Sequence, residues 1–212
     1  MRRFFVERLA PRVELDARQS RHASRVLRLQ PGDAVTLFDG RGHEADGRIV
    51  ELRPCVVEAG EPRTVAAGGP IIASALPKGK RADFMIEKLS ELGVAAFRPV
   101  HFARSVRRAT PSAVRRFERI AVESAKQCGR ARVMEILEPA TPEELSSDIM
   151  VADPRASGPL RGSAVLIGPE GGLTDAERAR FTRFGRLASN ILRIETAAIA
   201  AAVLCGDVSD AI

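Results

Sequence analysis

The chain has 212 residues, which suits one large domain or two small ones, and its 45% hydrophobic content is typical of a folded globular protein. No apolar run is long enough to cross a membrane and the N-terminus lacks an apolar signal segment, so the sequence predicts a cytoplasmic protein without a membrane span. The three cysteines and three histidines are scattered, which argues against a metal enzyme and a disulfide framework and predicts reduced, buried thiols.

The net charge of +6 is spread unevenly along the chain. Residues 1–77 carry 12 basic and 10 acidic side chains, residues 78–132 carry 14 and 5, and residues 133–212 carry 7 and 12. The basic middle segment would suit a phosphate backbone and so favours a nucleic-acid partner. The alternative is a set of arginine-rich helices that simply face solvent.

The first sixty-odd residues are typical of a small, mostly β unit. The apolar start Arg3–Val6 is followed by a helix pattern with Asp16 as N-cap and by two strands joined at a turn, over residues 16–29, 34–38 and 44–52. The small residues 66–70 form the best candidate linker. The sequence therefore predicts a first domain over residues 1–68 and a second over 70–212.

Beyond the linker, strands and helices alternate. Short apolar strands are expected over residues 71–76, 94–100, 149–152 and 164–167, and helices over 82–92, 112–127, 174–184 and 195–205. On the helix over 112–127, the inner face is expected to hold Val114, Phe117, Ala121 and Ser124. This alternation predicts an α/β fold with a mostly parallel sheet covered by helices.

A glycine-rich turn, Gly168-Pro169-Glu170-Gly171-Gly172, follows the strand over 164–167, and Thr174 then caps the next helix. The arrangement puts backbone N–H groups at the carboxyl end of a sheet, where α/β folds commonly bind ligands. The glycines would let a ligand approach the chain closely. The turn matches neither the dinucleotide fingerprint nor a P-loop, and an ordinary tight turn is the alternative.

A second feature is the segment Ile191–Ala197, in which Arg193 and Glu195 stand among apolar residues before a helix of small side chains. Burial of such charges is costly unless they are paired, so the two are either a structural ion pair or a working pair. Glu195 and Thr196 also suit the positive end of the helix dipole.

On these two motifs, GPEGGLTDAE and NILRIETA, the chain resembles the RsmE family of knotted SPOUT methyltransferases. Further matches in the right order span nearly the whole chain: RFF at the start, His22 with VLR and PGD, LFDG, ELGV, and ESAKQ with Arg130. Just before ILR, where the family commonly has a glycine and a basic residue, this chain has Ala188, Ser189 and Asn190.

The resemblance implies a C-terminal SPOUT domain with a trefoil knot and a PUA-like RNA-binding β-barrel at the N-terminus. Members of the family methylate N3 of a uridine in 16S ribosomal RNA of the small subunit with S-adenosyl-L-methionine, and they are usually homodimers. The cofactor would lie against the two motifs, held by Leu166, Ile167, Gly168, Glu170, Gly171, Gly172, Leu187, Ile191, Leu192, Ile194, Thr196 and Ala197.

Methylation of N3 requires the acceptor to be aligned with the sulfonium methyl group and its proton to be removed. Glu170 and Glu195 are candidates for the base or for positioning, and Arg193 could stabilise developing negative charge. A purely structural role for these residues stays open. The expected RNA-binding residues are Arg2, Arg3, His22, Arg25, Arg28, Arg104, Arg107 and Arg108, extended by Arg115, Arg116 and Arg119.

Three functional hypotheses follow. The first is a methyltransferase acting on small-subunit ribosomal RNA, with the assembled 30S subunit as the expected partner. The second is an RNA-binding ribosome-assembly protein whose catalytic site is degenerate, against which the intact GPEGG and ETA motifs argue. The third is a SPOUT methyltransferase that acts on transfer RNA instead.

Overall fold

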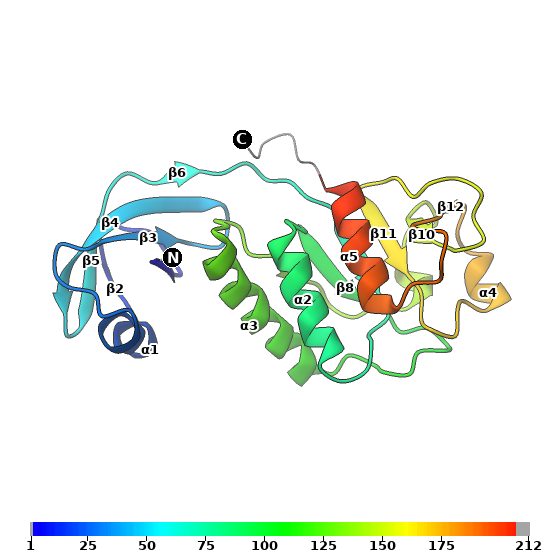
Figure 1. Cartoon of the computed structure of the whole chain (residues 1–212), viewed down its shortest axis with the longest axis horizontal. Coiled ribbons are helices and arrows are strands. Elements are labelled where there is room, and N and C mark those ends of the chain that lie inside the picture. Colours follow the sequence, from blue (N-terminus) through cyan, green and yellow to red (C-terminus); the bar gives the residue numbers. More distant parts are fainter. Residues whose placement is uncertain (1, 207–212) are drawn as a thin grey trace. The chain divides into compact units, whose positions relative to one another are not determined.

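The computed structural model describes residues 2–206, which form two compact units (Figure 1). The first unit contains the described residues up to Ala67 together with Val122–Val133, and the second contains Gly68–Ala121 and the described residues from Met134 on. Nothing in the sequence signals that Val122–Val133 packs with the first unit. Within residues 2–206, no helix is both long and apolar enough to cross a membrane.

A six-stranded sheet dominates the first unit, in the order β1-β3-β4-β5-β2 with β6 paired to β4. Strands β1 and β3 are parallel and the other pairs are antiparallel. The mostly β character predicted for this segment is confirmed. The strands are β1 (Arg3–Phe5), β2 (Arg12–Glu14), β3 (Ala34–Phe38), β4 (His43–Leu52), β5 (Cys55–Ala59) and β6 (Arg63–Thr64).

The helix expected over residues 16–29 begins as predicted but ends early. The Asp16 carboxylate accepts hydrogen bonds from the backbone N–H groups of Arg18 and Gln19, both at 2.8 Å, and caps α1 (Ala17–Arg21). The chain then continues as a π-helical turn, η1 (His22–Val26), and Arg28 adopts a left-handed conformation with φ 52°. A residue in that conformation ends a helix, so the predicted extension to residue 29 is wrong.

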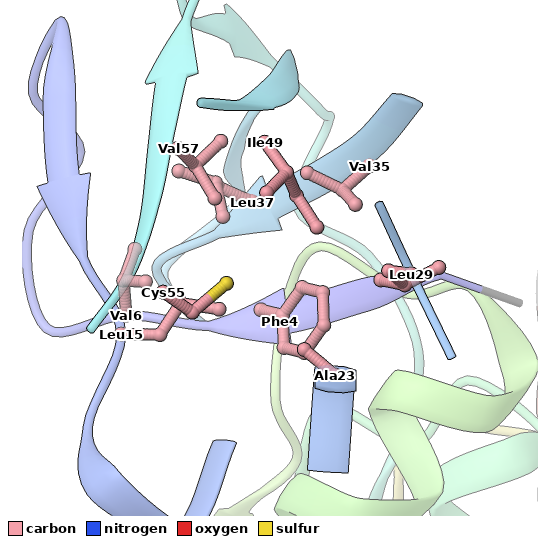
Figure 2. Packing of buried hydrophobic residues seen from close by; sticks show 10 residues of the cluster. All are labelled: Phe4, Val6, Leu15, Ala23, Leu29, Val35, Leu37, Ile49, Cys55 and Val57. Atoms are coloured by element: carbon pink, nitrogen blue, oxygen red, sulfur yellow. The ribbon is translucent and has the colours of Figure 1, made fainter. Parts of the chain in front are cut away.

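The hydrophobic core of the first unit lies on one face of this sheet (Figure 2). Phe4, Leu37 and Val57 are almost completely buried there, and Ala23 of η1 packs against them. The Cys55 thiol also belongs to this core, and burial raises its pKa. All three cysteines are unpaired, but Cys128 is exposed and Cys205 is half-buried, so the prediction of buried thiols is confirmed for Cys55 alone.

The second unit is built on a parallel sheet in the order β12-β10-β11-β7-β8-β9. Its strands are β7 (Ile71–Ser74), β8 (Ala96–Pro99), β9 (Glu135–Ile136), β10 (Met150–Ala152), β11 (Ala164–Ile167) and β12 (Arg183–Gly185). The helices are α2 (Arg81–Glu91), α3 (Pro111–Cys128), α4 (Asp175–Arg178) and α5 (Ile194–Cys205), with a 3-10 turn, η2 (Pro142–Glu144). The predicted α/β architecture is thereby confirmed.

Two of the predicted helices can be compared with the structure residue by residue. On α3 the predicted inner residues Val114, Phe117, Ala121 and Ser124 are all buried, and the Phe117 ring packs edge-on against Phe97 of β8. The prediction of a helix over 174–184 is wrong after Arg178, where α4 ends. Phe184 instead lies in β12, which pairs with β10, so strand pairing replaces the helical pattern there.

Candidate active site

Three loops at one edge of the second sheet enclose a cavity of about 480 Å³. They follow β10, β11 and β12, which are neighbours in the sheet and parallel, so their carboxyl ends meet at the same edge. The start of α5 completes the wall. The cavity is lined by segments 151–155, 167–173 and 187–188, by residues 190–192, and by Arg104, Arg178, Ile194 and Ala197.

The GPEGG turn after β11 is held in shape by its own backbone and by one arginine. The Gly172 N–H donates to the Pro169 carbonyl at 2.8 Å, and Gly172 has a φ of 68°, which favours glycine. Arg104 donates to the Gly171 carbonyl at 3.0 Å, and a Cβ on Gly171 would lie 3.3 Å from the Arg104 Cβ. The glycines therefore shape the loop and admit Arg104 beside it.

The predicted cap at Thr174 is confirmed. The Glu177 N–H donates to the Thr174 hydroxyl at 3.2 Å, and the Thr174 N–H donates back to the Glu177 carboxylate at 2.7 Å. The buried Glu177 carboxylate also accepts a bond from the Ala103 N–H at 2.7 Å. The capping residues thus fix both the end of the GPEGG loop and the segment that carries Arg104.

Before it reaches the cavity, the chain after β12 runs parallel to the loop between β10 and β11 and pairs with it. The Arg186 N–H donates to the Gly158 carbonyl at 2.8 Å, and the Leu160 N–H donates to the Arg186 carbonyl at 3.0 Å. A Cβ on Gly185 would lie 2.5 Å from the Leu160 Cα, so only glycine fits there. Glycine at position 185 thus lets the end of β12 lie directly beside the loop between β10 and β11.

The carboxylates of the two motifs share an arginine that sequence reasoning missed. Arg81 at the start of α2 lies 3.5 Å from Glu195 Oε1 and 4.0 Å from Glu170 Oε1. Glu195 is buried, and its Oε2 atom has no hydrogen-bond partner among the described residues. Arg193 is exposed as the N-cap of α5, so an ion pair between Arg193 and Glu195 does not form.

A second charged group in the cavity wall was also missed. Asp153, directly after β10, is buried and pairs with Arg178 and with Arg155, whose Nε lies 3.3 Å from Asp153 Oδ1. The sequence did predict this strand, and an acidic residue directly after its carboxyl end was a signal that could have identified Asp153. No group of histidine, cysteine and acidic side chains that could hold a metal ion occurs in residues 2–206.

Most residues expected to hold a cofactor lie in the cavity wall. These are Ile167, Gly168, Glu170, Gly171, Gly172, Leu187, Ile191, Leu192, Ile194 and Ala197. Leu166 is buried within β11, Thr196 is exposed on α5, and neither contributes to the lining. Ala188 and Asn190, where the chain departs from the family pattern, face the cavity as well.

The residues expected to bind RNA differ in exposure and in ion pairing. In the first unit His22, Arg25 and Arg28 are exposed, Arg2 pairs with Asp33 at 3.1 Å, and the Arg3 side chain is only 6% exposed in an ion pair with Glu44. In the second unit Arg104 lines the cavity, and the nearby Arg107 and Arg108 belong to the segment between β8 and α3.

Comparison with known proteins agrees with this geometry. Residues 70–205 match the model of the RNA methyltransferase domain, and residues 15–58 match that of the RNA methyltransferase PUA domain. A crystal structure of ribosomal RNA small subunit methyltransferase E from Neisseria gonorrhoeae, bound to S-adenosyl methionine, is 30% identical and superposes with a TM-score of 0.83 over 99% of this chain and 100% of that one. The chain belongs to this RNA methyltransferase family.

Other members are similar over nearly their full length. Ribosomal RNA small subunit methyltransferase E of Bacillus subtilis is 29% identical over 93% of each chain. A putative methyltransferase from Legionella pneumophila, in complex with bound SAM, is 25% identical with a TM-score of 0.77 over 94% of each chain. The likeness therefore covers both units, and the cavity lies within the segment that matches the RNA methyltransferase domain.

Proposed function

We propose that the protein transfers the methyl group of S-adenosyl-L-methionine to N3 of a uridine in 16S ribosomal RNA of the small subunit. The observation that supports this most directly is the cavity of about 480 Å³ formed by the GPEGG loop, the ILRIETA segment and the loop after β10. Its volume is within the range typical of small-molecule sites. Relatives with the same fold are crystallised with this methyl donor.

The cavity wall suits both ends of such a donor. Apolar side chains from the loops, among them Ile167, Leu187 and Leu192, would enclose the adenine. The backbone at Gly168, Gly171 and Gly172 would approach the donor's polar groups without a Cβ atom in the way. The donor supplies an already activated methyl group, so the chain has to orient it, exclude water and manage the proton on N3.

The proton on N3 needs an acceptor, and the carboxylates of the two motifs are the candidates. Glu170 lines the cavity, whereas Glu195 is buried and is not part of the lining, and Arg81 is close to both. Arg193, exposed at the N-cap of α5, would stabilise negative charge that develops on the acceptor. These roles assign the base to Glu170 or Glu195 and charge stabilisation to the arginine.

The RNA would be held by exposed basic residues of both units. Residues 1–68 are proposed as the RNA-binding domain, with His22, Arg25 and Arg28 as its exposed contacts. In the second unit, Arg107 and Arg108 would extend the grip near the cavity. A homodimer is proposed as the working form, because the apolar Val203 and Leu204 of α5 are 57% and 58% exposed.

The deciding experiment is methylation of purified small ribosomal subunits with a labelled donor, followed by mapping of the modified base. We expect the label on N3 of a single uridine of the 16S RNA. Labelling of another base, or of transfer RNA alone, would overturn the substrate assignment. Absence of donor binding by calorimetry would instead support an RNA-binding assembly protein.

The role of the carboxylates is tested by Glu170→Gln and Glu195→Gln in single-turnover methylation. Loss of a general base costs about 10²- to 10⁴-fold in rate, so the variant that lacks the base should lose that much while its donor affinity stays close to that of the wild type. Calorimetry on the same samples is the control for an intact cavity. Near-normal rates in both variants would exclude either carboxylate as the base.

A further inference from the structure

Three arginines, Arg104, Arg107 and Arg108, lie in the segment between β8 and α3, and all three are among the residues expected to bind RNA. Their positions differ. Arg104 lines the cavity, and its Nη1 donates to the Gly171 carbonyl at 3.0 Å and to the Leu173 carbonyl at 3.4 Å. Arg107 and Arg108 are exposed and are not part of the cavity lining. Arg104 is thus the arginine of this segment that is engaged with the GPEGG loop.

The backbone on either side of Arg104 is fixed by hydrogen bonds. The Ala103 N–H donates to the buried Glu177 carboxylate at 2.7 Å, and the Phe102 N–H donates to the Ser105 hydroxyl at 2.9 Å. The Ser105 N–H donates back to the Phe102 carbonyl at 3.1 Å. Because this backbone is already held in place, the hydrogen bonds of Arg104 require the ordering of its side chain alone.

The stem of the Arg104 side chain packs along the GPEGG loop at a position that has no Cβ atom. A Cβ on Gly171 would lie 3.3 Å from the Arg104 Cβ and 3.5 Å from its Cδ, which is tighter than most contacts of a Cβ. The carbonyl that the guanidinium binds at 3.0 Å belongs to the same glycine. Arg104 therefore follows the loop from its Cβ to its guanidinium, as a side chain that supports the loop would.

The supported part of the loop belongs to the wall of the cavity. Gly171 and Leu173, whose carbonyls Arg104 binds, both line it. From within, the loop is closed by the hydrogen bond between the Gly172 N–H and the Pro169 carbonyl. Glycines leave a backbone with much conformational freedom, so a loop of this kind needs further bonds to keep one shape. Without Arg104, binding of the methyl donor would have to order the loop at a cost in affinity.

We propose that Arg104 is a positioning residue for the methyl donor, which holds the GPEGG loop in the conformation that binds it, and that RNA contact by this segment belongs to Arg107 and Arg108. The inference rests on the proposed function, because it divides the arginines of one segment between the donor and the RNA. Arg104 acts through the loop, so its loss should change donor affinity first. Loss of Arg107 should change RNA affinity instead.

The test compares Arg104→Met with Arg107→Met, which removes the same charge from the same segment but from a residue outside the cavity wall. Calorimetry without RNA should give a Kd for the donor that rises about 5- to 10-fold in Arg104→Met, the size expected for one net hydrogen bond. The Kd of Arg107→Met should equal that of the wild type. Equal donor affinities in the two variants would overturn the proposal.

Methylation of small subunits gives the second comparison. The defect of Arg104→Met should appear mainly in the KM for the donor and should be recovered at saturating donor. A loss of about 10²-fold that persists at saturation would assign Arg104 to the chemistry itself and contradict a positioning role. Arg107→Met should weaken subunit binding and lower the salt dependence by about one phosphate contact. The same change of salt dependence in Arg104→Met would show that Arg104 binds RNA after all.

Hydrogen exchange of the Gly172 amide reports the loop directly. In the donor-free protein it should be faster in Arg104→Met than in the wild type, at unchanged stability in urea, and added donor should slow it again. Arg104→Lys should restore part of the protection, because its ammonium can reach one carbonyl. Unchanged exchange in Arg104→Met would contradict the proposal. If the wild type bound the donor but methylated another RNA, the substrate assignment would fail and the donor measurements would still decide the role of Arg104.

Discussion

Charged residues are used differently in the two units of the molecule. In the first unit, Arg3 and Arg63 both bind the buried Glu44 at 2.7 Å, and Arg63 also binds Asp46 at 2.7 Å. At the cavity of the second unit, one arginine serves both Glu170 and Glu195 at 3.5 Å or more, and Glu195 Oε2 has no partner among the described residues. The two buried carboxylates therefore differ: both oxygens of Glu44 are paired with arginines, whereas one oxygen of Glu195 has no partner among the described residues.

The largest effect that tests this contrast is expected from Arg3→Met. The Glu44 side chain is only 11% exposed. The variant removes one of its two arginine partners and leaves Arg63 as the other. Breaking a buried ion pair in this way costs about 3 kcal/mol of the free energy of unfolding. Urea denaturation measures the loss, and calorimetry should find the affinity for the methyl donor unchanged.

Arg12→Met is the matched control for that variant. Arg12 also binds two carboxylates, Glu51 at 2.5 Å and Glu58 at 3.8 Å, but all three side chains are more than half exposed. Exposed pairs contribute less than about 1 kcal/mol, so this variant should remain almost as stable as the wild type. If Arg3→Met were as stable as Arg12→Met, the paired charges of the first unit would not be what holds it together.

A smaller loss is expected from Gly185→Ala in the second unit, where close backbone packing rather than charge shapes the site. The new Cβ would lie 2.5 Å from the Leu160 Cα, so one of the two adjacent segments must shift, at a cost of about 2 kcal/mol. Because the chain continues from Gly185 into the cavity wall, affinity for the methyl donor should fall as well. Gly158→Ala has nothing within 4 Å and should change neither quantity.

Features that depend on neighbouring residues could be predicted from the sequence. The strand Ala164–Ile167 has the expected bounds, Thr174 caps α4, and the apolar residues of α3 face inward, because alternation and capping are local properties. The glycine-rich turn after this strand was predicted as a ligand site on its own residues. The ten cofactor residues that line the cavity, by contrast, were implied by the resemblance to the RsmE family.

Features that depend on residues far apart in the chain could not be predicted from the sequence. Arg81 and Glu195 are 114 positions apart, and no periodicity connects them. The buried Asp153 is paired with Arg178, a residue at the end of α4 that only the fold brings next to it. The helical pattern beyond α4 was misleading because pairing with β10 determines the conformation of Phe184. Tertiary contacts decide these positions, and the local sequence pattern does not encode them.

The smallest effect is expected from pH, and it should separate the two units. Hydrogen bonds from Arg63 lower the pKa of Asp46 below 3.8, so this carboxylate stabilises the first unit above that pH and loses its effect only in stronger acid. In the second unit, burial and the nearby Arg108 lower the pKa of His101 below 6.5, against an opposing effect of Glu144. The second unit should therefore respond to acid first.

His101 is neutral in the fold, because its Nε2 accepts a hydrogen bond from the Ala109 N–H at 2.9 Å. Below pH 6.5 the unfolded chain takes up a proton that the folded one does not, so stability decreases from there down to the lower pKa of the folded state. One such proton limits the slope to about 1.4 kcal/mol per pH unit. Hydrogen exchange of the Ala109 amide should accelerate over the same range. His101→Gln keeps an acceptor without a titrating group and should abolish this dependence, whereas the exposed His22→Gln should retain it. A dependence that survives in His101→Gln would assign the effect to another group and remove the distinction between the acid responses of the two units.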